Sequence, residues 1–304
     1  MNSAVSDRIR IIDPHHHLWD LTHHEYKWLQ RRPPEEGPDG DITPIAHDYF
    51  IADYLADTSA YELVKSVHVE AGWSGPDPVA ETQWLQSIAD VHGFPQGIVA
   101  YAALNESNVE HVLAGHRQYA NTRGIRQILN WHSDPGKTYL SRPDLMQDSA
   151  WLRGFALLDK YRLRFDLQLY PTQMADAAEL AAKHPDQPII LNHMGMPVDR
   201  DGEAVELWRR GMGLLAAREN VSVKISGPFI GNRSWTVASL RPFVLETIEL
   251  FGVDRVMLAS NFPVDKLYRS FTAMYGAFEE VLAAFPAVER HAMFYANAER
   301  LYGL

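Results

Sequence analysis

Eight short apolar runs rich in β-branched residues recur along the 304-residue chain, separated by segments of helical period. The expected strands cover residues 8–13, 64–70, 96–101, 124–130, 163–170, 187–192, 221–225 and 255–259. Several are almost wholly apolar, which is typical of a parallel sheet covered on both faces. The expected helices cover residues 80–92, 109–119, 151–161, 174–184, 204–218, 240–251 and 271–284. This alternation predicts an α/β fold, a (β/α)8 TIM barrel that forms a single domain over residues 1–304.

A doubly wound open sheet is the alternative fold. Such a sheet usually carries a glycine-rich phosphate-binding turn after its first strand. Here the first strand ends in three histidines, His15, His16 and His17, which favours the barrel. A long segment without regular period, residues 21–48, follows that strand and includes the turn sequence Gly-Pro-Asp-Gly at 37–40. In a barrel we expect this segment to lie over the catalytic face.

Composition limits the partners and the compartment. The chain has 28 basic and 39 acidic residues, a net charge of -11, and no long block of either sign, so neither nucleic acid nor an anionic membrane is expected to bind. The absence of cysteine excludes disulfides, thiolate metal sites and a cysteine nucleophile. No apolar run approaches the ~18 residues of a membrane span. We expect a cytoplasmic protein that acts on a small molecule, and a homo-oligomer is left open.

Polar side chains stand at the ends of seven of the eight expected strands. Barrel enzymes place their catalytic residues at these ends, and buried polar groups cost free energy unless their partners converge. Asp13, His15 and His17 alternate along the first strand, so we expect the carboxylate and both imidazoles to share one face. Imidazole is the commonest metal ligand and a good proton carrier. The other strand-end candidates are His68, Glu70, Arg126, Asn130, His132, Asp166, Gln168, Tyr170, His193, Lys224, Ser226, Ser260, Asn261 and Asp265.

In this order the motifs resemble the amidohydrolase superfamily, in its amidohydrolase-related (family 2) branch. That branch includes sugar-lactone hydrolases and 2-pyrone-4,6-dicarboxylate lactonase. The matching motifs span the chain: Asp-Pro-His-His-His-Leu-Trp at 13–19, Tyr-Lys-Trp-Leu at 26–29, Gly-Ile-Arg at 124–126, Phe-Asp-Leu-Gln at 165–168, Asn-His-Met-Gly at 192–195, Val-Lys-Ile-Ser-Gly at 223–227, Ser-Asn-Phe-Pro at 260–263 and Asn-Ala-Glu-Arg-Leu-Tyr at 297–302.

The resemblance implies roles for residues at the carboxyl ends of the first, sixth and eighth strands. His15 and His17 would bind one divalent ion, zinc or manganese, or would hold the substrate carbonyl in a metal-independent enzyme. His193 would assist that electrophilic role. The family's base is an eighth-strand aspartate, but this chain has Asn261, and an amide cannot take a proton at neutral pH.

Two carboxylates are candidates for the missing base. Asp265 leaves the same strand end, and we favour it, although it can equally be an ordinary helix-capping residue. Glu70 is the alternative, either as base or as a third metal ligand. Gln168 stands where the family often has a histidine for a second metal, so a two-metal site is not expected.

The remaining candidates are expected to contact the substrate. Arg126 and Lys224 would pair with a substrate carboxylate, or else with Glu70 or Asp166 inside the protein. Gln168 and His132 are further candidate contacts, and an apolar wall is expected from Trp19, Trp28, Trp73 and Trp131.

Three functional hypotheses follow from these residues. The first is a hydrolase that opens a sugar lactone or a pyrone or muconolactone by means of activated water. The second keeps the fold and is a metal-dependent decarboxylase or hydratase of an unsaturated carboxylic acid. In the third, the loss of the usual aspartate at Asn261 leaves a barrel that only binds a ligand.

Overall fold

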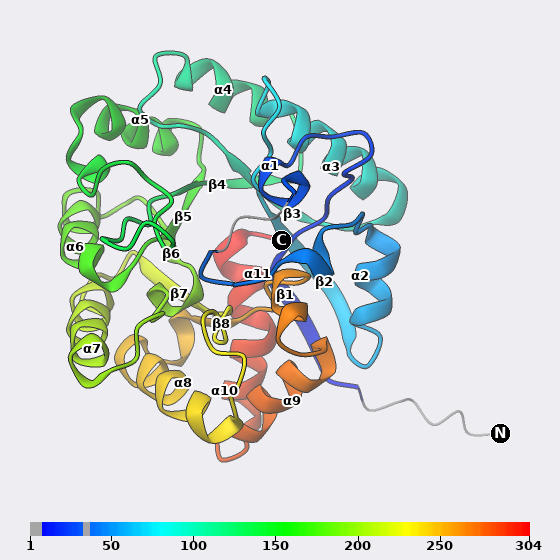
Figure 1. Cartoon of the computed structure of the whole chain (residues 1–304), viewed down its shortest axis with the longest axis vertical. Coiled ribbons are helices and arrows are strands. Elements are labelled where there is room, and N and C mark those ends of the chain that lie inside the picture. The colour runs from blue at the N-terminus through cyan, green and yellow to red at the C-terminus, as the bar shows by residue number, and fades with distance from the viewer. Residues whose placement is uncertain (1–7, 33–36) are drawn as a thin grey trace.

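The computed structural model describes residues 8–32 and 37–304, and within them eight parallel strands follow one another in chain order, each paired with the next. Their bounds are β1 Arg10–His16, β2 Glu62–Val69, β3 Gly97–Tyr101, β4 Thr122–Ile128, β5 Arg164–Gln168, β6 Ile189–Leu191, β7 Val221–Ile225 and β8 Val256–Leu258. A parallel bridge between His16 and Phe262 brings the first and last strand ends together. The structure is a nearly closed (β/α)8 barrel (Figure 1), which confirms the predicted fold and excludes the open sheet.

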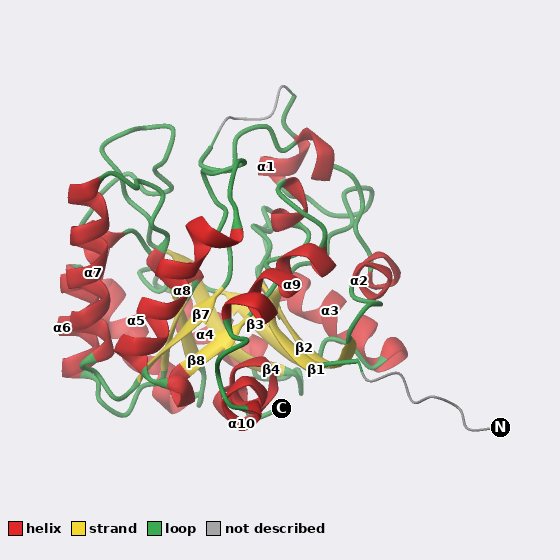
Figure 2. Ribbon diagram, turned by 90° about the horizontal axis from the view of Figure 1, so that it is seen from below, coloured by secondary structure: helices red, strands yellow, loops and turns green. Residues whose placement is uncertain are grey.

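Helices surround the barrel (Figures 1 and 2). They are α1 Lys27–Gln30, α2 Ile51–Asp57, α3 Val79–His92, α4 Val109–His116, α5 Ser149–Lys160, α6 Met174–Lys183, α7 Gly202–Ala216, α8 Val237–Phe251, α9 Phe271–Val281, α10 Ala287–His291 and α11 Asn297–Tyr302. All seven expected helices are present, with ends that differ by a few residues. Across residues 8–32 and 37–304, we find no helix with the length and apolar character that spanning a bilayer requires.

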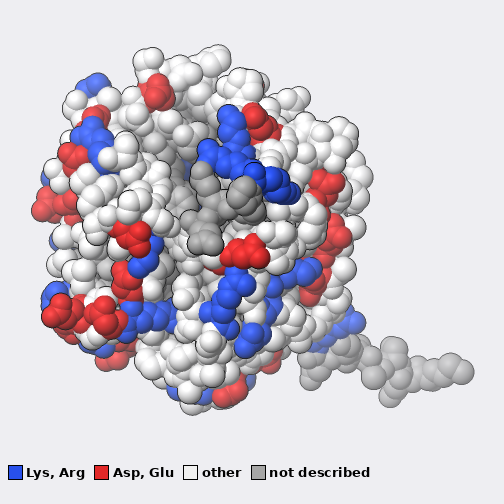
Figure 3. Space-filling view, in the orientation of Figure 1, with Lys and Arg blue, Asp and Glu red and all other residues white. Residues whose placement is uncertain are grey.

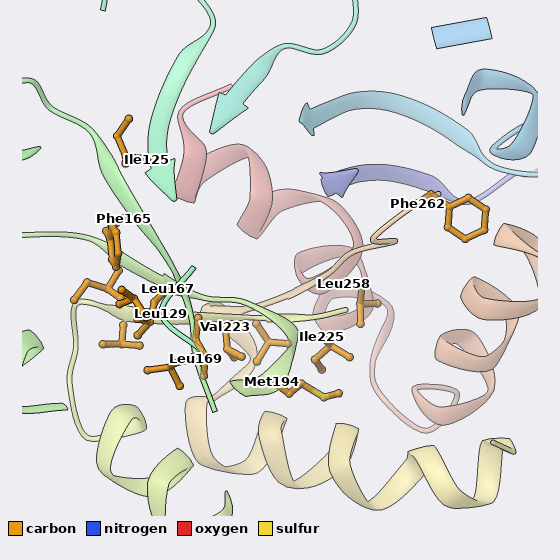
Figure 4. Close-up of a cluster of buried hydrophobic side chains, with 14 of the residues drawn as sticks. Ile125, Leu129, Phe165, Leu167, Leu169, Met194, Val223, Ile225, Leu258 and Phe262 are labelled. Carbon is orange, nitrogen blue, oxygen red and sulfur yellow. The ribbon is translucent and has the colours of Figure 1, made fainter. Parts of the chain in front are cut away.

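Two apolar clusters hold the barrel together. The larger fills the layer between the strands and the helices, and Figure 4 shows part of it, including Phe165, Val223 and Leu258. The second contains Ile12 of β1 together with Tyr302 of α11, so that α11 closes the end of the barrel opposite the strands' carboxyl ends. Because both faces of the strands are buried, the strands can be nearly all apolar, as their sequences are.

The long segment after β1 is ordered where the structure describes it. It contains α1 and a 3₁₀ turn at Thr43–Ile45, and Figure 2 shows it above the carboxyl ends of the strands. Its aromatic residues are anchored: Tyr26 is buried, and Trp28 Nε1 donates to the carbonyl oxygen of Ala71 at 2.8 Å. Residues 33–36, within the predicted loop, lie outside the described part.

Candidate functional site

A cavity of about 390 Å³ opens at the carboxyl ends of the strands. We call its strand-end residues the floor: His17, Arg126, Gln168, His193 and Asn261, all of them buried. We call four residues of the segments that follow β1 and β4 the rim: Trp28 of α1 and the loop residues Asp39, Thr138 and Tyr139, which are half-buried or exposed. The space-filling view from this side shows a hollowed face (Figure 3). The cavity therefore lies where barrel enzymes place their active sites.

The end of β1 departs from simple alternation. A register shift separates Asp13 from His16 in the pairing with β2. As a result, the Asp13 carboxylate turns to Ser260 and Tyr54, accepting bonds of 2.5 and 2.7 Å, and does not join the imidazoles. His16 stacks on the same Tyr54. The expectation that Asp13, His15 and His17 share one face is therefore wrong for Asp13, because the bulge adds a residue to the strand.

Three imidazoles converge beneath the cavity. The ring of His15 lies 5.1 Å from that of His17 and 4.6 Å from that of His193, centroid to centroid. His17 Nδ1 lies 2.8 Å from the carbonyl oxygen of Val69, which can only accept, so the hydrogen is on Nδ1. His193 Nδ1 lies 2.9 Å from Ser226 Oγ. The hydrogen bonds thus fix the orientation of both rings that reach the floor.

These imidazoles are neutral at neutral pH. Burial, together with the positive charge of Arg126, lowers the pKa of His17 to about 3. Burial likewise holds the pKa of His193 and His15 well below the usual value, with help from Arg126 for the first and from Lys224 for the second. A neutral imidazole offers one hydrogen and one lone pair, so His17, whose hydrogen is on Nδ1, keeps a lone pair at Nε2, while Nε2 of His193 is the nitrogen left for a substrate.

Two buried ion pairs support the floor. Arg126 Nε donates to Glu70 Oε1 at 2.7 Å, and Arg126 Nη1 donates to Gln168 Oε1 at 2.8 Å. The Glu70 Oε2 atom accepts the backbone N–H of Gly72, so both oxygens of this carboxylate are occupied. Arg126 faces the cavity although it is paired. Of the alternatives that the sequence left open for Arg126, the structure shows the internal pair with Glu70.

The second pair is sealed from solvent. Lys224 Nζ donates to Asp166 Oδ1 at 2.5 Å, and both side chains are fully buried. Tyr302 Oη donates to the same carboxylate at 2.8 Å. Lys224 Nζ also lies 3.4 Å from His15 Nδ1. Lys224 therefore lies behind the imidazoles, where a substrate carboxylate does not reach it.

At the end of β8, an amide separates a carboxylate from the cavity. Asn261 Oδ1 lies 3.3 Å from His17 Nε2, and Asn261 Nδ2 donates to Asp265 Oδ1 at 3.0 Å. Asp265 is buried, and its Oδ2 finds no hydrogen-bond partner in the described part of the chain. Burial raises the pKa of Asp265 well above its usual value, and the nearby carboxylate of Asp39 adds to the rise. Asp265 is thus linked to the cavity through Asn261 alone.

Strained backbone presents two floor residues. His193 and Asn261 have φ angles of 55° and 56°, in the left-handed region that costs most non-glycine residues about 1–2 kcal/mol. Gly227 leaves room for the first of them, because a Cβ there would lie 2.9 Å from His193 Nδ1. Strain of this kind persists where the surrounding structure holds a side chain in a working position.

The residues do not fit a tightly held divalent ion. The described part of the chain has no group of three His, Asp or Glu side chains with ligand geometry. Glu70, expected as a ligand with His15 and His17, is committed to Arg126 and Gly72. His15 Nε2 is buried without a hydrogen-bond partner among the described residues, but one free imidazole nitrogen does not by itself make a ligand set.

The remaining predicted residues divide between the cavity and its surroundings. Trp28 and Gln168 line the cavity. His132 does not: its Nε2 lies 3.1 Å from Asp199 Oδ2, outside the cavity lining. Trp19, Trp73 and Trp131 are also absent from the lining, so the expected tryptophan wall reduces to Trp28. Sequence reasoning missed Asp39, Thr138 and Tyr139; the turn signal at 37–40 was the available pointer to Asp39.

Comparison with known proteins identifies the family to which the chain belongs. The amidohydrolase family model matches residues 12–304, so the chain belongs to the amidohydrolase family, a family of hydrolases. This confirms the resemblance that the motifs indicated. A relative from Sinorhizobium fredii, called uncharacterized protein y4mH, is 48% identical over 97% of this chain and 98% of its own length.

More distant relatives carry lactonase names. L-fucono-1,5-lactonase of Burkholderia multivorans is 25% identical over 96% of both chains, and L-rhamnono-gamma-lactonase of Scheffersomyces stipitis is 24% identical over 63% of this chain and 65% of its own. A Burkholderia multivorans amidohydrolase solved with bound HEPES matches 97% of this chain and 99% of its own, at 25% identity and a TM-score of 0.81. A structure of an amidohydrolase from that species with bound zinc has the same coverage, 23% identity and a TM-score of 0.80, a likeness of fold.

Proposed function

We propose that this protein hydrolyses a lactone, a cyclic ester, in the cavity at the mouth of the barrel. The observation that carries the proposal is the floor, where the neutral imidazole of His193 and the guanidinium of Arg126 lie in one cavity with Asn261, behind which Asp265 is buried. Lactone opening needs donors for the carbonyl oxygen and an acceptor for a proton from water. The lactonase names of the distant relatives support the same reaction.

The electrophilic half of the reaction belongs to His193 and Arg126. If Ser226 Oγ–H donates to His193 Nδ1, the hydrogen of this neutral imidazole is on Nε2, free to bind the substrate carbonyl oxygen. Arg126 keeps N–H groups beyond those given to Glu70 and Gln168. As water attacks, the carbonyl oxygen gains negative charge, which these preorganised donors stabilise.

The basic half of the reaction belongs to Asp265, whose Oδ1 accepts a hydrogen bond from Asn261 Nδ2 at 3.0 Å. While water attacks, the Asn261 side chain turns aside and the ionised Asp265 takes the proton from that water, because an amide itself takes no proton at neutral pH. The new C–O bond forms, the ring C–O bond breaks, and Asp265 returns the proton to the leaving alkoxide oxygen. Glu70 is the less suitable base, because both its oxygens are already bonded.

A substrate panel tests the reaction. The purified protein is assayed with aldono-1,4- and 1,5-lactones, a pyrone dicarboxylate and unsubstituted δ-valerolactone, and proton release reports ring opening. Unsaturated carboxylic acids are assayed in parallel for decarboxylation or hydration. Turnover of a lactone with release of one acid per ring is expected. If only the unsaturated acids are turned over, the protein is a decarboxylase or hydratase and not a lactonase. If no compound is turned over but one binds measurably, the barrel only binds a ligand.

Elemental analysis tests the argument about the metal. Because Glu70 is committed to Arg126 and Gly72 and the described residues contain no three-ligand group, protein purified without chelator is expected to hold far less than one zinc or manganese per chain and to turn over lactone fully. A stoichiometric ion whose removal abolishes turnover, and whose return restores it, would show that the site does hold a metal.

A further inference from the structure

Asp39 stands out among the residues around the cavity because its carboxylate has no role in the proposed reaction. Among the described residues that line the cavity, it is the one acidic side chain. It belongs to the segment after β1, at the rim, opposite the strand ends that provide the floor. Its side chain is half-buried, and within residues 8–32 and 37–304 its one side-chain hydrogen bond comes from Tyr268 Oη to Oδ1, at 3.0 Å.

Contacts from two other loops fix the position of Asp39. Arg233, after β7, donates from Nη2 to the carbonyl oxygens of Asp39 and Asp41, at 3.0 and 2.9 Å. Tyr268, after β8, holds the carboxylate itself. The backbone N–H of Gly40 closes the turn on Gly37 O at 2.9 Å. Asp39 is therefore held against the cavity from three sides, with its second carboxylate oxygen left to accept.

The Asp39 carboxylate determines the net charge of the side chains that line the cavity. Arg126 is neutralised by Glu70, and Lys224, behind the floor, is neutralised by Asp166. The imidazoles are neutral. The guanidinium of Arg233 binds backbone oxygens and not the carboxylate. Arg233 lies outside the cavity lining, so an ionised Asp39 places on the described lining a negative charge to which no cationic side chain is bonded; this charge disfavours an anionic substrate and accepts hydrogen bonds from hydroxyl groups.

The rest of the upper cavity is largely apolar. Trp28, Ile42, Met196, Ile230 and Val264 line it. Such a surface suits the C–H face of a saturated ring whose hydroxyl groups point towards one polar side. A carboxylate on one side and apolar side chains on the others are the complementary surface for a polyhydroxylated ring that carries no charge.

We propose that Asp39 selects the substrate class: an uncharged, polyhydroxylated lactone whose neighbouring hydroxyl groups donate to its carboxylate. This inference rests on the proposed function for the reaction and adds the group that recognises the substrate. By the same reasoning, a lactone that carries a carboxylate, such as a pyrone dicarboxylate, is a poor substrate.

Two variants separate recognition of hydroxyl groups from exclusion of charge. In Asp39→Ala, the KM for an aldono-1,5-lactone is expected to rise about tenfold, the scale of one hydrogen bond to a charged acceptor, while kcat and the KM for δ-valerolactone change less than about twofold. In Asp39→Asn, which keeps an acceptor for Tyr268, the KM for a carboxylated lactone is expected to fall several-fold. Asp41→Asn is the matched control, since Asp41 lies in the same turn and its side chain binds the N–H of Thr43.

Isothermal titration calorimetry measures binding without turnover, so it tests the role of Asp39 even if the protein hydrolyses no lactone. An aldonolactam, with nitrogen in place of the ring oxygen, is titrated into wild type, Asp39→Ala and Asp41→Asn, each checked by thermal melting. Weaker binding in Asp39→Ala alone supports the inference even if no lactone is opened, a result that would remove only the proposed function. Equal binding by all three, or an unchanged preference between hydroxylated and plain lactones, would overturn the role of Asp39.

Discussion

The floor and the rim of the cavity are built from different kinds of chain. Floor residues leave the ends of strands and are buried, and Arg126 among them is held by hydrogen bonds to both Glu70 and Gln168. Rim residues belong to loops and are more exposed; Asp39 is held through one side-chain bond and the backbone contacts of Arg233. A floor built on strands can hold donors to a fraction of an ångström, as chemistry requires. A rim built on loops can change the substrate without disturbing that chemistry.

The difference predicts that floor variants change kcat and rim variants change KM. The largest effect is expected for His193→Asn, because it removes a donor aimed at the developing oxyanion. Steady-state kinetics on the preferred lactone should show kcat reduced by about 10²–10³-fold, with KM within about threefold and the melting temperature close to wild type. His132→Asn is the control, since His132 pairs with Asp199 outside the cavity. If kcat falls as much in His132→Asn as in His193→Asn, the proposed difference between floor residues and residues outside the cavity is wrong.

The second-largest effect is expected for Asp265→Asn, in which kcat should fall about 10²-fold because the base is lost. The pH profile carries the sharper information. Burial raises the pKa of Asp265 well above its usual value, and the base works only when ionised, so kcat/KM of the wild type should increase with pH through that raised pKa. The variant should lose this increase. If kcat/KM of Asp265→Asn still rises over the same pH range as in the wild type, the group that titrates is not Asp265.

A smaller effect is expected from the titration of Asp39. Burial raises its pKa to about 6, against the lowering by Tyr268 and Arg233, so the carboxylate is ionised at pH 7 and largely protonated at pH 5. KM for the hydroxylated lactone should therefore rise roughly five- to tenfold between pH 7 and pH 5, while KM for δ-valerolactone stays level. The titratable and charged groups that face Asp39 from other elements are Arg233, Tyr268, Asp265, Tyr139 and Tyr170. The dependence should disappear in Asp39→Ala, and its persistence there would point to one of these neighbours.

The smallest effect is expected for Arg233→Ala. Removing the guanidinium frees the backbone of the turn at 37–40 but leaves the Asp39 carboxylate bound to Tyr268. KM for the hydroxylated lactone should rise about threefold, the scale of one neutral hydrogen bond, with kcat unchanged. Arg241→Ala, which removes an exposed pair with Glu280 on the outer helices, should change neither value. A larger loss in kcat than in KM would mean that the turn also positions the floor.

The difference between floor and rim also explains which parts of the fold and of the site could be predicted from the sequence. The eight strands, the seven main helices and the floor residues His17, Arg126, Gln168, His193 and Asn261 were predictable, because strand period and barrel topology place polar strand ends together. The rim was not, since a loop has no period that indicates which side chain faces inward, and Asp39 depends on contacts with Arg233 and Tyr268 far along the chain.

Within the floor, alternation alone also failed at one point. The parity of Asp13, His15 and His17 predicts a shared face, but the bulge in β1 sends the carboxylate to Ser260 and Tyr54. Bulges follow from pairing with the neighbouring strand, which local sequence does not record. Likewise, the sequence could offer Glu70 as ligand or base but could not show that Arg126 occupies it.

The contact between Tyr302 and Asp166 also bears on the order in which the protein is made. Asp166 pairs with Lys224, Lys224 lies against His15, and the hydroxyl of Tyr302 donates to both oxygens of Asp166. A nascent chain that has extended only through β7 has every imidazole of the site but lacks this support and the apolar contribution of α11. The hydrogen-bonded network behind the imidazoles is therefore complete only once Tyr302, far along the chain, has packed against Asp166 of β5.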